Sequence, residues 1–217
     1  MTEKSLMRLA SKSVEVKSLR DLVRSRTSEN PALLLDLSGS MAMHMHNGKT
    51  RQQGLREVVT GLQSKRPTTM IGFGMDATPG HPMEPNSGGQ LVGFINEIPE
   101  ALGPSTPLAE AIDFARVGGF AKAVVISDGI PDDRSAAMAA AMSFGGQIDV
   151  IFVGNPGEPG SIFLEELAKA TGGRRFEGDL ADVKEITGAV IGLLNGEVME
   201  EEDDDDDDED DEDEDDE

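Results

Sequence analysis

The sequence contains no cysteine, which excludes disulfide bridges and thiolate metal sites. It also has no apolar run close to the roughly 20 residues that a membrane-spanning helix needs, so we expect no membrane partner. Residues 1–26 interleave Lys and Arg with isolated Leu and Val, a pattern without the continuous apolar core of a signal peptide. These absences predict a soluble cytoplasmic protein.

Charge is abundant but unevenly placed. The 217 residues include 42 Asp and Glu against 19 Lys and Arg, a formal net charge of −23. The eighteen residues from Glu200 to Glu217 are all acidic, which leaves 24 acidic and 19 basic residues, a formal charge of −5, before them. Because a run of like charges repels itself and buries no apolar surface, residues 197–217 are predicted to form a disordered polyacidic tail.

The tail leaves several roles open. It can act as a solubilising segment, recruit a basic partner, or compete with nucleic acid for such a partner as a polyanion mimic. One of its carboxylates can also occupy a site on the folded domain, since eighteen extended residues reach as far as about 60 Å. Direct binding to nucleic acid is not expected, because phosphate backbones select for Lys and Arg.

Short apolar runs alternate with amphipathic stretches along the middle of the chain, which is typical of a parallel α/β sheet. Strands are predicted at Ala32–Leu35, Met70–Phe73, Ala123–Ile126, Val150–Val153 and, more briefly, Arg174–Phe176. Helices are predicted around the stripes Leu55–Leu62 and Leu108–Ala115, and at Arg134–Met142, Ser161–Ala170 and Leu180–Leu194. We expect one domain over residues 31–196, an irregular loop or edge hairpin at 76–89, and a partly helical extension over 1–30.

Three polar segments lie where predicted strands end. Asp36-Leu37-Ser38-Gly39-Ser40-Met41 follows the first strand, and Ser127-Asp128-Gly129 ends the central one. Gly103-Pro104-Ser105-Thr106-Pro107 forms the loop before the second apolar stripe. In an open parallel sheet such segments lie above the carboxyl ends of the strands, where ligands bind near a switch in strand order. Two carboxylates and several hydroxyls are therefore expected to meet at one point.

The chemistry of these segments favours a hard divalent cation. Their polar groups are all oxygen donors, which suit Mg²⁺ held in near-octahedral geometry at about 2.0–2.1 Å, or alternatively Mn²⁺ or Ca²⁺. The alternate residues Asp36, Ser38 and Ser40 can reach one centre if the loop curls, and Gly39 is expected to leave room for that curl. With few charged ligands in direct contact, the cation stays electrophilic and favours an outside carboxylate.

The pattern resembles the metal-ion-dependent adhesion site of von Willebrand factor A domains, which is D-x-S-x-S followed by a distant Thr and a distant Asp. All five positions are filled in this chain, by Asp36, Ser38, Ser40, Thr106 and Asp128. The resemblance covers about residues 31–194 in element order. It implies a Rossmann-like, mostly parallel sheet with helices on both faces and one antiparallel edge strand.

The resemblance also implies how the site works. Ser38, Ser40 and, in an open form, Thr106 would coordinate the cation directly, while Asp36 and Asp128 act largely through water. An Asp or Glu of a partner protein would complete the shell. The function expected is therefore an adaptor or assembly factor, not an enzyme, and by resemblance a MoxR-type AAA+ ATPase is a candidate partner.

Other interpretations remain beside this one. The first polar segment can be a turn that caps the next helix, and Thr106 can itself be a helix N-cap. Gly48-Lys49-Thr50 matches the end of a phosphate-binding loop, but Met43 stands where that motif requires its first Gly. His44 and His46 can bind a transition metal or belong to a flexible Met-containing lid over the site.

Two other function classes also stay open. A metal-assisted hydrolase would use the same cation to activate water and would need a general base close by. The candidates for that base are His44, His46, Asp132 and Asp133, which show no recognisable arrangement in the sequence. A structural or virion-associated protein would instead act mainly through the polyanionic tail.

Overall fold

The computed structural model describes residues 31–66, 68–74, 92–100, 103–155 and 157–196. These form a six-stranded sheet in the order β3-β2-β1-β4-β5-β6, in which β3 is antiparallel to β2 and all other neighbours are parallel. The strands are β1 (Ala32–Asp36), β2 (Thr69–Phe73), β3 (Val92–Ile95), β4 (Lys122–Ser127), β5 (Gln147–Phe152) and β6 (Arg175–Glu177). The chain leaves β1 toward one edge and returns through β4 toward the other, so the switch in strand order lies between β1 and β4.

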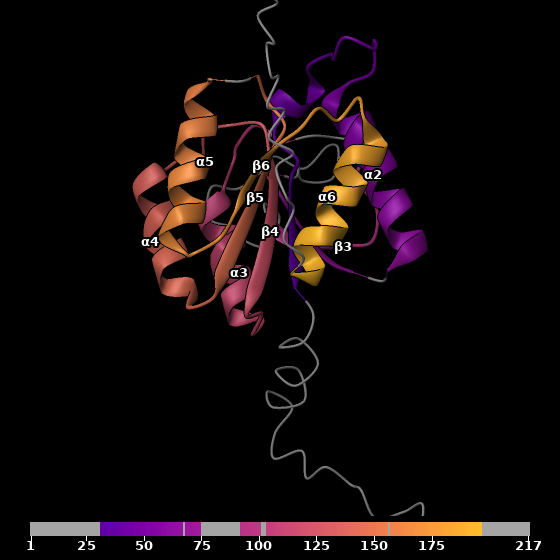
Figure 1. Ribbon diagram of the computed structural model, residues 1–217. Coiled ribbons are helices and arrows are strands. Elements are labelled where there is room, and N and C mark those ends of the chain that lie inside the picture. Colours follow the sequence, from indigo (N-terminus) through magenta and orange to yellow (C-terminus); the bar gives the residue numbers. More distant parts are fainter. Residues whose placement is uncertain (1–30, 67, 75–91, 101–102, 156, 197–217) are drawn as a thin grey trace, which may run out of the picture.

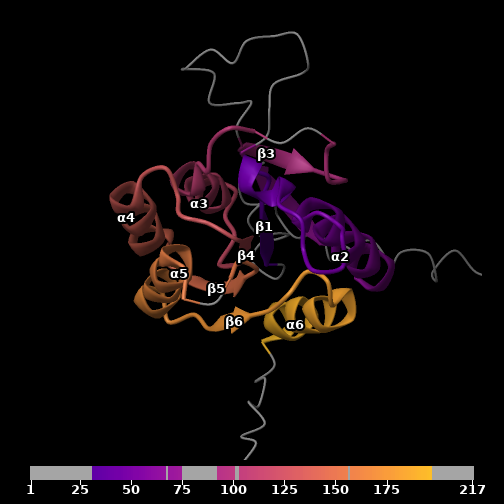
Figure 2. The ribbon, with the colours of Figure 1, turned by 90° about the horizontal axis from the view of Figure 1, so that it is seen from above.

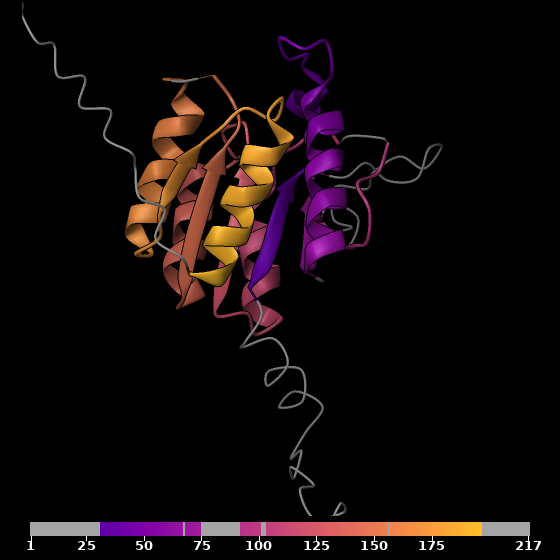
Figure 3. The same cartoon turned by 45° about the vertical axis from the view of Figure 1, so that its right-hand side comes forward.

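Helices cover both faces of this sheet (Figures 1 and 2). On one face lie α3 (Leu108–Val117), α4 (Arg134–Phe144) and α5 (Pro159–Ala170), and on the other α2 (Arg51–Lys65) and α6 (Val183–Asn195). The α6 helix packs beside α2 against the strands, as Figure 3 shows. A short 3-10 helix, η2 (Gly39–Ala42), precedes α2.

The central strand β1 shows why this sequence forms a buried parallel strand. All five of its residues are buried. Side chains alternate across a strand, so Ala32 and Leu34 enter the hydrophobic core under α3, α4 and α5, while Leu33 and Leu35 enter the core under α2 and α6. A strand covered on both faces needs such a continuous apolar run. The first polar residue, Asp36, therefore stands at the carboxyl edge of the sheet.

The α2 helix begins directly after the loop that follows β1, and its start is well defined. Thr50 Oγ1 accepts from the backbone N–H of Gln53, and the side chain of Gln53 accepts from the backbone N–H of Thr50. This reciprocal capping box satisfies two donors that a helix start otherwise leaves unpaired. The buried stripe Leu55, Val58, Val59 and Leu62 holds the helix against the sheet.

The α/β fold class and the helices on both faces are confirmed, and β3 supplies the antiparallel edge strand that the resemblance implied. Two boundaries were wrong by three residues. The strand β5 begins at Gln147, not at Val150. The last helix begins at Val183, not at Leu180, because the side chain of Asp182 accepts from Glu185 N–H and caps it there. Leu180 is still buried in the core. The predictions for residues 1–30, 76–89 and 197–217 lie outside the described residues, and no helix within the described ranges is long and apolar enough to span a bilayer.

Removal of the cap of α2 should destabilise the protein. We expect Thr50→Ala to lower the free energy of unfolding by about 1 kcal/mol, because the N–H of Gln53 loses its acceptor. Thr60→Ala is the matched control: its exposed side chain only donates back to Arg56 C=O in the same helix, so this change should lie within about 0.5 kcal/mol of zero. Urea unfolding followed by circular dichroism measures both, and equal losses would contradict the capping role.

Candidate metal centre

The three polar segments predicted from the sequence meet at the carboxyl edge of the sheet. Gly103 N–H donates to Leu37 C=O, and Ser38 and Gly103 form an isolated parallel β-bridge. The loop before α3 therefore lies against the loop after β1. Asp128 follows β4, the neighbour of β1 in the sheet. A cavity of about 610 Å³ opens between these segments, and its lining includes Ser38, Ser40, Thr106 and Asp128. The fifth predicted residue, Asp36, is fully buried.

Hydrogen bonds link Asp36 to the residues around it. Its Oδ1 accepts from Ser38 N–H at 2.9 Å, and its Oδ2 accepts from Ser127 Oγ at 2.5 Å. Both oxygens of this buried carboxylate are thus engaged, as burial of a polar group requires. Ser127 was missed as a member of the site, since a serine at the end of a strand carries no distinctive sequence signal.

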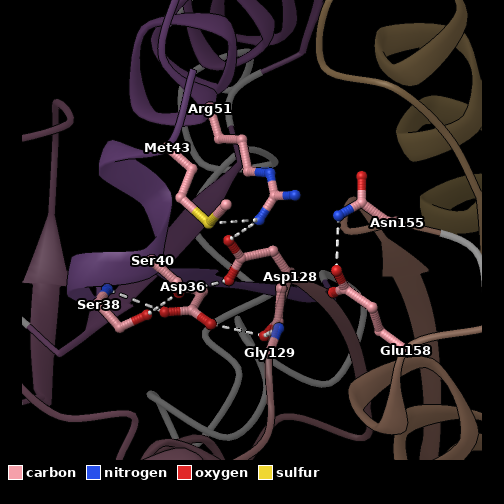
Figure 4. Close-up of polar contacts among 10 residues, drawn as sticks. Asp36, Ser38, Ser40, Met43, Arg51, Asp128, Gly129, Asn155 and Glu158 are labelled. Atoms are coloured by element: carbon pink, nitrogen blue, oxygen red, sulfur yellow. Dashed lines mark hydrogen bonds and ion pairs between the residues drawn. The ribbon is translucent and has the colours of Figure 1, made fainter. Parts of the chain in front are cut away.

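Ser38, Ser40 and Asp128 form a second chain of contacts (Figure 4). Ser40 Oγ donates to Asp128 Oδ1 at 2.7 Å, and Ser38 Oγ lies 3.0 Å from Ser40 Oγ. A hydroxyl has one proton and two lone pairs, so if Ser40 gives its proton to Asp128, the proton between the two serines comes from Ser38. Both hydroxyls then keep lone pairs that no hydrogen bond uses within this chain of contacts.

This arrangement fits a hard cation. The donor set consists of hydroxyl oxygens with free lone pairs, backed by two carboxylates, at the wall of an open cavity. Across the described ranges there is no group of three or more His, Cys, Asp or Glu side chains able to hold a metal ion. Ser38, Ser40 and Thr106 are the residues placed to do so, and metal binding itself stays a prediction.

Thr106 is fixed by a pair of hydrogen bonds to the loop after β4. Its N–H donates to Asp132 Oδ2 at 2.9 Å, and Asp132 N–H donates to Thr106 C=O at 3.1 Å. The alternative in which Thr106 caps the next helix does not hold, because α3 begins at Leu108 with Pro107 before it and no side chain caps it. The side chain of Ser38 likewise makes no capping hydrogen bond to η2. Neither residue is therefore held at the cavity by a capping role.

Close packing of the loops depends on a different glycine from the one expected. A side chain at Gly39 would meet only an ordinary contact, 3.6 Å from Gly103 O. At Gly74, which follows β2, a Cβ would lie 2.6 Å from Ser105 O and 3.0 Å from Ser38 N. Gly74 also has a φ of +80°, a conformation that favours glycine. The sequence prediction for Gly39 was thus wrong, and Gly74 is the residue that lets the two site loops approach.

Arg51, the first residue of α2, was also not predicted as part of the site. Its Nη1 lies 2.5 Å from Asp128 Oδ2, and the side chains of Arg51 and Asp128 are 9% and 0% exposed. Nη1 also lies 3.9 Å from Met43 Sδ. A cation in the first turn of a helix is unfavourable, because it faces the positive end of the helix dipole. That mismatch was the available signal that Arg51 needed a carboxylate partner.

The histidines belong to a neighbouring cavity of about 480 Å³, whose lining includes His44, His46 and Arg51. His46 Nδ1 lies 3.0 Å from Asp179 Oδ2. Neither histidine lines the cavity of Ser38 and Ser40. Met41 does not belong to the expected Met-containing lid, because it is fully buried in the core, whereas Met43 is 53% exposed.

Asp36 is the titratable group at this site with a clearly raised pKa. Burial raises its pKa from the usual 3.8 to about 6, hydrogen bonds from Ser127 and Ser38 oppose the rise, and the charge of Asp128 adds to it. Without a cation, Asp36 therefore keeps its proton up to about pH 6. A positive charge at the site would favour loss of that proton.

The contribution of Asp36 to folding should decrease as pH rises from about 4 to 6 in metal-free protein. The folded chain holds this proton more tightly than the unfolded chain, so Asp36 favours folding below its unfolded pKa and opposes it above its folded pKa. The interval from 3.8 to about 6 corresponds to roughly 3 kcal/mol at most. Urea unfolding in chelator should show Asp36→Asn gaining stability over wild type by about that amount across this range. Asp113→Asn, at an exposed position, is the control, and a difference for Asp36→Asn that stays constant with pH would contradict the raised pKa.

Comparison with known proteins places the fold. No family model matches the chain, and no curated protein matches its sequence. Among solved structures, the chain is similar to a von Willebrand factor type A protein from Catenulispora acidiphila, with a TM-score of 0.52 and 16% identity. The match covers 75% of this chain and 42% of that one, so the chain spans less than half of that protein's length. The chain thus has an α/β fold of the von Willebrand factor A type.

Proposed function

We propose that this chain is a protein-docking module that binds an Asp or Glu side chain of a partner through a divalent cation. The observation that carries the proposal is the convergence of two serine hydroxyls and two carboxylates beside an open cavity at the switch point of the sheet. The residues proposed to hold the cation are Asp36, Ser38, Ser40, Thr106 and Asp128. When bound, the cation supplies positive charge and open coordination positions for an outside carboxylate.

The charges at the site support a metal-dependent interaction. The formal charge of the site is −1 when both carboxyls are ionised, because Asp36 and Asp128 contribute two negative charges and Arg51 contributes one positive charge. Glu158, whose side chain accepts from Asn155, lines the same cavity and adds a further negative charge (Figure 4). An acidic partner is therefore repelled by the bare site, and a divalent cation offsets this repulsion. Mg²⁺ is the expected ion, with Mn²⁺ and Ca²⁺ as alternatives, because all the donors are oxygen atoms.

The same geometry favours docking over hydrolysis. A hydrolase would need a general base near the cation. Asp132 accepts from Thr106 N–H, Asp133 accepts from Ala136 N–H as the cap of α4, and His46 lies against Asp179. His44 lines the neighbouring cavity. Each candidate base among the described residues thus has a structural partner or lies beside another cavity, so we propose an adaptor or assembly factor that is not an enzyme.

The identity of the partner follows from chemistry and resemblance only. The site requires a protein that presents an Asp or Glu, and a MoxR-type AAA+ ATPase in the cytoplasm remains our candidate by resemblance to von Willebrand factor A proteins. The polyacidic residues 197–217 are proposed either to recruit a basic partner or to compete with the acidic partner for the cation. Both of these roles concern residues outside the described ranges.

Loss of one serine hydroxyl should weaken cation binding. We expect Ser38→Ala to reduce affinity for Mn²⁺ and Mg²⁺ by about 10- to 100-fold in isothermal titration calorimetry, because a proposed ligand is removed. Ser64→Ala is the control, since that exposed hydroxyl only donates to Gly61 C=O within α2. Equal affinities for wild type and Ser38→Ala, or no binding by wild type, would refute the proposed site.

Deletion of the acidic tail should strengthen binding of an acidic probe. We expect the chain without residues 200–217 to bind a synthetic Glu-containing peptide more tightly than the full chain in Mg²⁺, because the competing carboxylates are gone. Fluorescence anisotropy at physiological salt measures this, with chelator as the blank. Unchanged affinity in the deletion would discard competition by the tail while leaving the proposed site intact.

A further inference from the structure

Arg51 is placed to control how Asp128 meets a cation. The carboxylate of Asp128 has two oxygens, and each already has a partner: Oδ1 accepts from Ser40 Oγ at 2.7 Å, and Oδ2 lies 2.5 Å from Arg51 Nη1. The Asp128 side chain is fully buried, so water does not compete for these oxygens. For Asp128 to bind a cation directly, one of the two contacts has to break or become shared.

Burial of the Arg51 guanidinium at the start of a helix is energetically unfavourable without a carboxylate partner such as Asp128. A buried guanidinium loses its hydration, and at the start of a helix it also faces the positive end of the helix dipole. Its described contacts are Asp128 and the weak acceptor Met43 Sδ at 3.9 Å. Lys49, two residues earlier, instead pairs with Glu57 on the outer side of the helix and stays half exposed. Of these two basic side chains, only that of Arg51 therefore points inward, to one oxygen of Asp128.

We propose that Arg51 is a positioning residue that keeps Asp128 out of direct contact with the cation. This inference rests on the proposed function of the site. With Oδ2 bound to Arg51 and Oδ1 to Ser40, the direct ligands that the five proposed site residues offer are the uncharged hydroxyls of Ser38, Ser40 and Thr106. Uncharged ligands leave the charge of the cation available to an outside carboxylate.

Removal of the guanidinium should change two affinities in opposite directions. Without Arg51, Asp128 Oδ2 is free to turn to the cation, and one positive charge that repels the cation is lost, so the cation binds more tightly. The negative charge of Asp128, once in direct contact with the cation, makes the cation less attractive to an outside carboxylate. Arg51 therefore lowers affinity for the metal and raises affinity for the partner's acidic side chain.

The test uses the full chain, Mn²⁺ as the metal and acetate as the carboxylate probe. Calorimetry gives the affinity for Mn²⁺, and enhancement of water-proton relaxation by bound Mn²⁺ reports the waters that remain on the ion. For Arg51→Met we expect Mn²⁺ affinity to rise by about tenfold or more, bound water to decrease, and acetate to displace less of it than in wild type. Arg51→Lys, which keeps the charge, should stay close to wild type.

Lys49→Met is the matched control, because it removes the same charge two residues away without touching Asp128. Its exposed charge is screened by solvent and salt, so Mn²⁺ affinity should change by no more than about twofold. Stability gives a second readout. In metal-free Arg51→Met, the buried carboxylate of Asp128 has lost the guanidinium that pairs with it. Mn²⁺ should therefore raise the melting temperature of this variant more than that of wild type. If Arg51→Met does not fold without metal, Arg51→Gln takes its place with the same expectations.

The outcomes separate this inference from the function on which it rests. If wild type binds Mn²⁺ and Arg51→Met binds it equally or more weakly, with unchanged bound water, the positioning role is overturned while the metal site stands. If wild type and all variants fail to bind Mn²⁺, the proposed function fails first. Tighter Mn²⁺ binding by both Arg51→Met and Lys49→Met would show that net charge alone, and not the contact with Asp128, sets the affinity.

Discussion

The buried carboxylate of Asp128 is the group around which the candidate site is organised. It directly follows β4, in the middle of the sheet, where a charge without partners is strongly unfavourable. Its partners come from two other segments: Ser40 from the loop after β1 and Arg51 from the start of α2. The requirement to satisfy one buried charge therefore fixes the positions of a hydroxyl of the candidate site and of a helix start at the same time.

The topology of the sheet explains why this charge meets Asp36. Strands β1 and β4 are neighbours although about ninety residues separate them, and their chains leave toward opposite edges of the sheet. Between the two connections a crevice opens at the carboxyl edge, which is where α/β sheets bind ligands. Asp36 and Asp128 stand at the two ends that border it. Because both lie in a buried environment, the pKa of Asp36 rises to about 6, and the site has electrostatic reason to accept a cation.

Much of the fold and of the site was predictable because it depends on local patterns. Continuous apolar runs such as Leu33-Leu34-Leu35 signal strands covered on both faces, and polar residues directly after them must lie at one edge of a parallel sheet. The D-x-S-x-S spacing then placed three donors in one loop. What escaped prediction depends on contacts between distant segments. Arg51 pairs with a residue 77 positions away, and Gly74, which has a positive φ, is needed because the backbones of Ser105 and Ser38 pack against it.

A few errors had local physical causes. Leu180 continues the apolar pattern of α6, but the helix cannot begin there, since Asp182 and its hydrogen bond to Glu185 set a later start. Thr106 stands before Pro107, a combination that favours a helix start, yet the loop is held instead by the hydrogen bonds between Thr106 and Asp132. In both cases a side chain from outside the expected pattern decided the outcome.

We propose that the hydroxyls of Ser38 and Ser40 hold a divalent cation. An anomalous difference map from crystals of the protein grown with MnCl₂ tests this most directly. We expect a strong peak within coordination distance of both hydroxyl oxygens, with Asp128 still in contact with Arg51 and not bound to the ion. A map with no peak at this position, while Mn²⁺ is found elsewhere on the protein, would contradict it.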